Sequence, residues 1–266
     1  METGHVLWLA HTKKKQAACD FCDFVGEDRM SKVAAVACDM NADFEAAFPG
    51  RRPHLKAACD RFHLVKNLDE KVISAVRKDE QARPGDEGLD EEAKALKGSK
   101  RIPMAKASTR SAKDRDARAG KTVIRGGELF GKREVVQAGG NRKRREGLIG
   151  RNELLAACDI VKELLAKAYG YKQEKRMLDT MEEVVAVCRG TGDKHFEWFA
   201  RLAGNHMDGI VAHARYPISS GKVEGTNAMI KALRRTGYGH PDDERFFLKI
   251  FDASRHHSPS RKEAVA

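Results

Sequence analysis

"KVAAVACDM", residues 32–40, is a continuous apolar run that ends in an acid, Asp39. The segment "HLKAACDRFH", residues 54–63, repeats the pattern, and its apolar run ends in Asp60. Short apolar runs bounded by polar residues are typical of interior strands that are covered on both faces. The sequence therefore predicts two buried strands, each followed by an aspartate at its C-terminal end.

Helical patterns alternate with these strands in the first 80 residues. We expect helices at residues 14–26, at 41–50, where Pro49-Gly50 should stop the helix, and at 64–78, together with a further buried strand at residues 5–10. An alternation of strands and helices indicates an α/β layer, whose ligands bind at the carboxyl ends of the strands. The two aspartates are therefore candidate site residues.

Positive charge is concentrated in one segment. The chain has a formal net charge of +11, and residues 97–145 hold 16 Lys and Arg against 4 Asp and Glu, a net charge of +12. An excess of this size favours a polyanionic partner, most simply DNA or RNA, although a basic protein without such a partner is the alternative. The segment is poor in large apolar residues, which predicts a loop, a tail-like insertion or disorder. It serves either as a DNA-contacting arm or as a solvated face.

Several classes of protein are disfavoured. No apolar run approaches the roughly 20 residues of a membrane span, and the N-terminus does not resemble a signal peptide. Six cysteines in 266 residues do not suggest a disulfide scaffold, so a reducing, cytoplasmic setting is expected. Cys19 and Cys22 form a CxxC pair without two further zinc ligands, and helix packing is preferred over zinc binding. Small buried residues are expected at the other four: Cys38, Cys59, Cys158 and Cys188.

The chain from Asn152 onward has helical periodicity. Asn152 is a candidate N-cap for the first of these helices. Further helices are predicted over residues 174–189, 195–212, 222–235 and 243–253.

The segment "SGKVEGTNAMIKALRRTGYG", residues 220–239, is the most informative of these helices. At 100° per residue, one face carries Glu224, Asn227, Lys231 and Arg235. A separate apolar face, suited to docking on a sheet, carries Val223, Thr226, Ile230 and Leu233. The polar face thus begins with a carboxylate and continues with cations.

Glu224 has two interpretations. The helix dipole stabilises an anion in the first turn, which is a purely structural explanation. The functional interpretation joins Glu224 to Asp39, because carboxylates that converge on one edge bind Mg²⁺ through oxygen ligands. Paired ions of this kind support phosphodiester chemistry.

Three blocks carry a resemblance to a known family. "VAAVACDM" (33–40), "ACDRFHLVKNLDEKV" (58–72) and residues 220–239 resemble the transposases of the ISL3 insertion-sequence family. The resemblance covers about residues 6–78 and 152–255, and "NELLAACDIVKELL" is similar to the family's inserted helical region. It implies an RNase H-like fold and a metal-dependent Asp-Asp-Glu site, with Mg²⁺ or Mn²⁺ as cofactor. The implied partners are the element's ends and target DNA, with a homo-oligomer and nucleoid association compatible with this role.

The resemblance also implies roles for single residues. Asp39 is similar to the family's second aspartate and Glu224 to its glutamate, so both are expected to be catalytic metal ligands. Asp60 is a weaker catalytic candidate that lines the site, and His63 is either a packed helix-start residue or a neighbour of the site. The expected DNA-binding residues are Asn227, which orders the glutamate or the DNA, and Lys231, Arg234 and Arg235.

The chain also departs from the family's pattern. It starts at what resembles the third strand of the sheet, and the first two strands and the first catalytic aspartate find no match. We therefore expect a partial RNase H-like α/β sheet without its N-terminal strands, combined with a helical insertion and C-terminal helices. The expected parts are residues 1–80, a basic segment at 81–150, a helical insertion at 151–215, C-terminal helices with the glutamate at 216–255, and a tail at 256–266.

The expected function is that of a transposase, or of a transposase remnant with impaired activity. A non-catalytic basic DNA-binding protein is the alternative, and a metal-dependent nuclease of the same fold is a third possibility.

Overall fold

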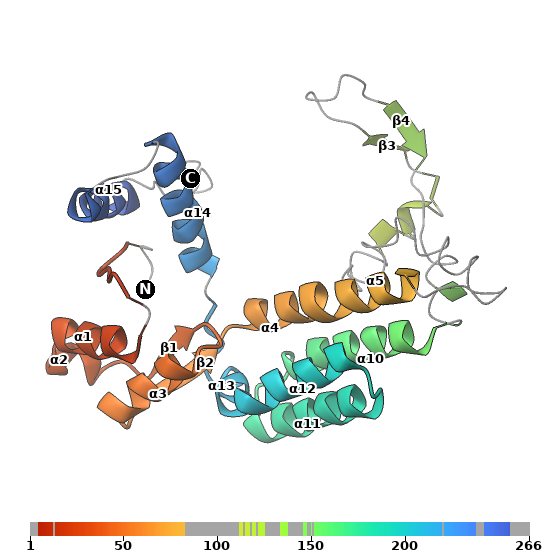
Figure 1. Cartoon of the computed structure of the whole chain (residues 1–266), viewed down its shortest axis with the longest axis horizontal. Helices are drawn as coiled ribbons and strands as arrows, with labels where there is room; N and C mark the ends of the chain where they lie inside the picture. The colour runs from red at the N-terminus through yellow and green to blue at the C-terminus, as the bar shows by residue number, and fades with distance from the viewer. Residues whose placement is uncertain are drawn as a thin grey trace. The chain divides into compact units, whose positions relative to one another are not determined.

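The computed structural model of the chain describes residues 5–12, 14–82, 112–113, 115–117, 119–120, 122–125, 134–137, 146–147, 150, 152–219, 221–237 and 242–255. The chain divides into two compact units, drawn in Figure 1. The first unit comprises Met1–His63 and Asp208–Ala266, and the second comprises Leu64–Met207. The boundary falls inside one helix, α4 (Arg61–Asn67).

Two parallel strands form the sheet that the structure describes in the first unit. They are β1 (Ala35–Cys38) and β2 (Lys56–Cys59), and Cys38 lies opposite Cys59. Both predicted strands are therefore confirmed. The expected cover on both faces is wrong for β1, because three of its four residues are only half-buried. The described sheet is too small for a strand to lie in its interior.

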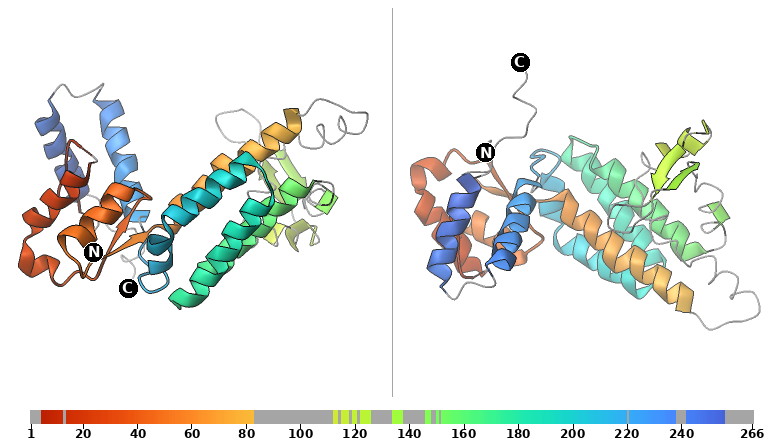
Figure 2. Two further views of the ribbon diagram at one scale, coloured as in Figure 1. Left: turned by 60° about the horizontal axis from the view of Figure 1, so that its bottom comes forward. Right: turned by 90° about the horizontal axis from the view of Figure 1, so that it is seen from above.

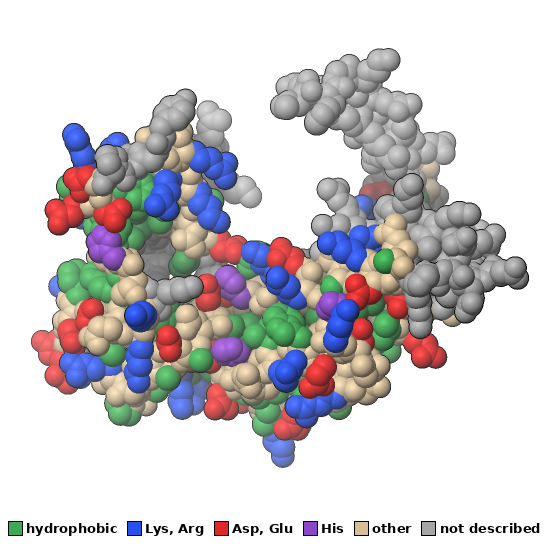
Figure 3. Space-filling model, viewed as in Figure 1, with side chains coloured by type: hydrophobic (Ala, Val, Ile, Leu, Met, Phe, Trp, Pro, Cys, Tyr) green, Lys and Arg blue, Asp and Glu red, His purple; other side chains and the backbone are tan. Residues whose placement is uncertain are grey.

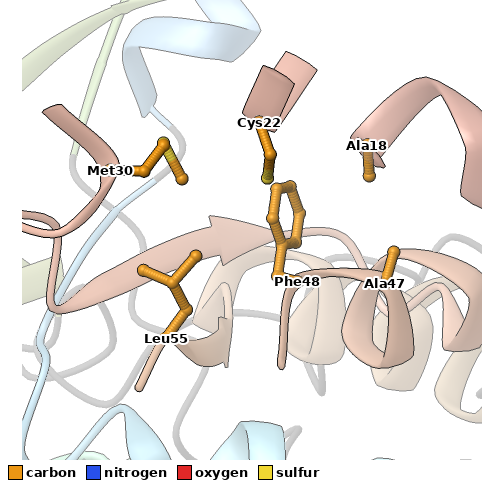
Figure 4. Close-up of a cluster of buried hydrophobic side chains, with 6 residues drawn as sticks. All are labelled: Ala18, Cys22, Met30, Ala47, Phe48 and Leu55. Carbon is orange, nitrogen blue, oxygen red and sulfur yellow. The ribbon is translucent and has the colours of Figure 1, made fainter. Parts of the chain in front are cut away.

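Helices pack against this sheet and against one another. They are α1 (Lys15–Val25), α2 (Glu27–Met30) and α3 (Ala42–Arg51). The side chains that meet between them form a buried cluster, shown in Figure 4: Ala18, Cys22, Met30, Ala47, Phe48 and Leu55. Cys22 is fully buried there, which confirms that it serves helix packing. Gly26 joins α1 to α2 with φ of 82°, a conformation that favours glycine.

Pro49 does not stop α3, contrary to the prediction. The helix begins after Asn41, whose side-chain oxygen accepts a hydrogen bond from the N–H of Asp43, and it continues to Arg51. Pro49 removes one N–H, which would have bonded to the carbonyl of residue 45. Because only two helical residues follow, the loss of one bond is tolerated, and Arg52 N then donates to the carbonyl of Phe48 at 2.8 Å.

Residues 5–10 do not form the predicted strand. This segment instead lies as irregular chain along α15 (Asp243–Arg255). The N–H of Val6 donates to Oγ of Ser254 at 3.2 Å, and the ring of His11 stacks on Phe247 with centroids 4.6 Å apart. Trp8 contacts Phe21 of α1 with ring centroids 5.8 Å apart, whereas Leu7 is 62% exposed.

The second unit is built mainly from long helices. A continuous helical stretch runs through α4, a π-helical segment η1 (Leu68–Ile73) and α5 (Ser74–Ala82). It is followed by α10 (Glu153–Ala168), α11 (Glu174–Gly190) and α12 (Lys194–Asn205). These helices confirm the predicted periodicity. The single helix predicted over 195–212 is wrong, because His206 adopts φ of −115° and ψ of 18°, and a new helix, α13 (Met207–Ala212), begins after it.

The helices of the second unit run alongside one another, as both views of Figure 2 show. Their buried side chains include Leu68, Val161, Met181 and Phe199. Polar contacts supplement this core. The Asn152 side chain caps α10 by accepting from Leu155 N at 2.9 Å, as predicted, and donates to Oε2 of Glu80 at 2.6 Å. Lys162 pairs with Asp69 at 2.7 Å.

Within the basic segment the structure describes one pair of strands. β3 (Thr122–Arg125) pairs antiparallel with β4 (Glu134–Gln137), a hairpin that the sequence did not predict. Most of residues 83–151 lies outside the described residues, so the expectation for the segment as a whole stays a prediction. Among the described residues, no helix is both long and apolar enough to cross a membrane.

Candidate active site at the ends of the parallel strands

Two aspartates lie at one edge of the sheet, each directly after a strand. Asp39 directly follows β1 and Asp60 directly follows β2. Because the strands are parallel and their last residues lie opposite each other, both acids lie at the same edge. Asp39 has a side chain that is 65% exposed, and its Oδ1 lies 2.7 Å from Nε2 of His63, in the first turn of α4. The edge therefore pairs a solvent-facing carboxylate with an imidazole.

Asp60 has a different environment from Asp39, since it is only 2% exposed. Its Oδ1 accepts a hydrogen bond from Phe62 N at 3.2 Å, and its main-chain oxygen accepts from His63 N at 3.2 Å. These are the bonds of a helix N-cap. Asp60 thus fixes the beginning of α4 and, through it, the place of His63.

His213 also lies within the electrostatic reach of this edge. The pKa of its ring is lowered, mainly because burial disfavours the charged imidazolium. The carboxylate of Asp60 opposes this shift, and the guanidinium of Arg61 adds to it. The sequence did not single out His213, because the residue follows α13, some 150 positions beyond β2.

The two cysteines at the strand ends are held as neutral thiols. Sγ of Cys59 donates to Oε1 of Glu45 at 3.0 Å. Burial, followed by this hydrogen bond, raises the pKa of Cys59, and burial with the charges of Glu45 and Asp39 raises the pKa of Cys38 to about 12. Neither thiol is suited to act as a nucleophile at neutral pH. Glu45 is one of two acids on α3, and no sequence pattern distinguishes it from Asp43.

Gly209 brings α13 unusually close to β2. A Cβ atom at this position would lie 2.6 Å from Sγ of Cys59 and 3.7 Å from the main-chain oxygen of Ala57. A glycine inside a helical apolar pattern is a sequence signal for such close packing. Sequence reasoning had nonetheless not singled it out.

The helix that carries the predicted glutamate is α14 (Gly221–Thr236). Glu224 is half-buried in its first turn, and the predicted DNA-binding side chains are exposed: Asn227, Lys231, Arg234 and Arg235. Figure 3 shows Lys and Arg side chains gathered along this helix. The expected docking of the apolar face on a sheet is wrong for the described residues, because Val223 is 58% exposed and α14 has no fully buried side chain. Its described contacts include α15.

The structure brings together some of the predicted site residues. Asp39 and His63 are in contact, and Asp60 lies at the next strand end. Glu224 belongs to the same unit, and in the view of Figure 1 the Gly221 end of α14 points toward the strands. Within the part of the chain that the structure describes, Asp39, Asp60 and Glu224 do not form a set of three ligand atoms that all lie within 4.8 Å of one another.

Comparison with known proteins identifies the class and the family. The chain is 23% identical over 250 residues to the transposase for insertion sequence element IS1001 of Bordetella parapertussis. The ISL3 family model, described as a transposase, matches residues 1–250. The chain therefore belongs to the ISL3 family of transposases, which confirms the resemblance seen in the sequence.

The alignment covers most of this chain but only part of the relative. The alignment with the IS1001 protein covers 92% of this chain and 53% of that protein, so the chain spans about half the length of this curated relative. No solved structure matches the chain. The α/β class agrees with the parallel strands and their helices, while the RNase H-like fold remains a prediction.

Proposed function

We propose that this chain acts in DNA transposition, with Asp39 and Glu224 as carboxylate ligands for divalent cations that serve DNA strand cleavage and transfer. The observation that carries the proposal is the carboxylate of Asp39. It stands exposed at the carboxyl end of a parallel strand, and His63 contacts one of its oxygens at 2.7 Å. Membership in a transposase family supports DNA as the partner.

The donor groups at the edge suit a hard cation. Asp39 and Glu224 offer carboxylate oxygens, which Mg²⁺ and Mn²⁺ prefer over softer ligands. The thiols of Cys38 and Cys59, next to the two strand-end acids, are buried. When bound, divalent cations stabilise the attacking and leaving oxygens in phosphodiester chemistry.

The remaining residues of the proposed site bind and position DNA. Lys231, Arg234 and Arg235 are exposed on the helix whose first turn carries Glu224, so they suit contacts to phosphates near a cut. Asn227, one turn after Glu224, suits a hydrogen bond to the carboxylate or to DNA. These contacts fix the register of the DNA without reading its sequence.

The family's site has three carboxylates, and the proposed site has two matched ones. Only Asp39 and Glu224 match the family's acids in this chain. Asp60 is only 2% exposed and one of its oxygens caps α4, so a cation could bind only its other oxygen, and burial restricts access to it. We therefore expect strand transfer by this chain alone to be impaired.

A nicking and strand-transfer assay with Mg²⁺ or Mn²⁺ tests the proposal. We expect Asp39→Asn and Glu224→Gln each to lower metal-dependent nicking at least about 100-fold, whereas Glu182→Gln, an exposed acid on α11, leaves it unchanged. Full activity of Asp39→Asn would refute the proposed site. A loss in Asp60→Asn as deep as in Asp39→Asn would make Asp60 the third ligand.

The alternative function is that of a non-catalytic DNA-binding protein. The exposed cations of α14 favour it, since they bind phosphates whether or not a metal site is complete. DNA binding without nicking under any metal condition would support this alternative. Nicking without strand joining would indicate a nuclease.

A further inference from the structure

We infer that His63 is a positioning residue for Asp39: its Nε2 holds Oδ1 and thereby presents the rest of the carboxylate to a divalent cation. The inference rests on the proposed function, because it assigns a role toward the same metal ligand. The contact that carries it is the 2.7 Å distance between Nε2 and Oδ1. This is the length of a strong hydrogen bond between an imidazole N–H and a carboxylate.

The place of His63 is determined by the main chain around it. Its N–H bonds to the carbonyl of Asp60, whose side chain caps the same helix. The His63 ring stands edge-on to Phe62, with centroids 5.7 Å apart and the ring planes at 90°, and its side chain is 26% exposed. The backbone of His63, which carries the donor Nε2, is therefore fixed independently of its contact with Asp39.

Asp39 has more freedom and gains more from the contact. It follows the last residue of β1, and its own carbonyl accepts from Asn41 N at 2.7 Å, so its backbone is fixed while its side chain is 65% exposed. An exposed carboxylate without a partner samples several rotamers, and a ligand must pay the entropy of ordering it. A hydrogen bond to one oxygen removes that cost and leaves the other oxygen for a cation.

Partners of metal ligands commonly act in this way. They orient the ligand, and their loss typically lowers metal affinity about 10–100-fold. The alternative is an ordinary surface ion pair, which would have no effect on metal binding. The two explanations differ in what removal of the donor, as in His63→Ala, should do to metal binding.

Mn²⁺ binding to the full chain, measured by calorimetry or by electron paramagnetic resonance, tests the inference. We expect His63→Ala to weaken Mn²⁺ binding about 10-fold or more, and His63→Gln, which keeps a nitrogen donor near Nε2, to stay within about 3-fold of the parent chain. In an Asp39→Asn background, His63→Ala should have no further effect. Melting curves identify any variant that fails to fold; if His63→Ala does, His63→Leu, which fills the space but donates no hydrogen bond, takes its place and should also weaken Mn²⁺ binding.

A matched histidine provides the control. His195 also lies at the start of a helix, with Nε2 3.0 Å from Oδ2 of Asp79 in the second unit. His195→Ala should leave Mn²⁺ binding unchanged. Parent-like binding by His63→Ala, or equal losses in His63→Ala and His63→Gln, would overturn the positioning role. If Asp39→Asn itself leaves Mn²⁺ binding unchanged, the proposed function fails instead.

Discussion

Gly209 and Cys59 show how one atom can limit what a position accepts. A Cβ at Gly209 would lie 2.6 Å from Sγ of Cys59, which is fully buried. We expect Gly209→Ala to lower the free energy of unfolding by about 1–3 kcal/mol, because overpacking outweighs the better helix propensity of alanine. Urea denaturation of the full chain measures this change.

A control variant and a double variant test this prediction further. At Gly204 of α12 an added Cβ meets nothing within 4 Å, so Gly204→Ala should be neutral or slightly stabilising. Cys59→Ala removes the clashing sulfur. In that background, Gly209→Ala should therefore lower the free energy of unfolding by less than it does in the parent chain. Equal stability of the Gly204→Ala and Gly209→Ala chains would contradict the close packing.

Cys188 makes stability depend on alkaline pH. Burial, with a contribution from the charge of Glu197, raises its pKa from 9.0 to about 12. Below pH 9 the thiol is protonated in both the folded and the unfolded chain. As pH rises from 9 toward 12, only the unfolded chain releases the proton, so stability falls, by roughly 1 kcal/mol at pH 10 from this group.

Unfolding free energies at pH 7.5 and pH 10 test this. Cys188→Ala should be less stable at pH 7.5 but should lose less on going to pH 10. Val184→Ala, a cavity in the same helix without a thiol, should keep the full alkaline loss. If all three chains lose the same amount, Cys188 does not cause the dependence.

At the scale of single elements, α14 combines an acid at its start with cations toward its end. Lys231, Arg234 and Arg235 are exposed, and phosphate contacts carry no sequence information. Replacing all three with alanine should weaken binding equally on random DNA and on DNA from the element's ends, as a gel-shift titration would show. The matched control replaces three exposed cations of α11: Lys175, Arg176 and Arg189. A loss confined to one DNA sequence would contradict phosphate binding.

At the scale of the whole molecule, charge separates one segment from the rest. Residues 97–145 carry a net charge of +12, while the complete chain carries +11, so the remainder is nearly neutral. We predict that this segment supplies non-specific DNA affinity by releasing counterions. Deleting it should flatten the dependence of log affinity on log salt concentration. An unchanged slope in the deletion chain, with its melting curve intact, would rule this out.

Local patterns were sufficient to predict most of the helices and both parallel strands. The cap at Asn152, the apolar periodicity of α10 and α11, and the apolar runs before Asp39 and Asp60 all act over a few residues. These signals depend on neighbouring residues in the sequence and not on tertiary contacts. The family match likewise follows from local blocks, and it confirms the chain as an ISL3 transposase relative.

At the N-terminus, a distant partner decided the outcome against the sequence prediction. Residues 5–10 have the composition of a strand but pack along α15 without strand pairing, with Val6 bonded to Ser254, 248 positions away. The apolar face of α14 likewise does not dock on the described sheet. The spacing of apolar residues does not tell which distant segment such a face contacts.

The sequence by itself determined that two acids each follow a strand and that a basic helix carries a third acid. Only the tertiary structure distinguished the two strand-end acids, which share the local context Ala-Cys-Asp. Asp39 is exposed and contacts His63, whereas Asp60 is buried and caps α4. The physical reason is that burial and hydrogen bonding depend on which distant segments cover an atom, and local periodicity carries no record of those segments.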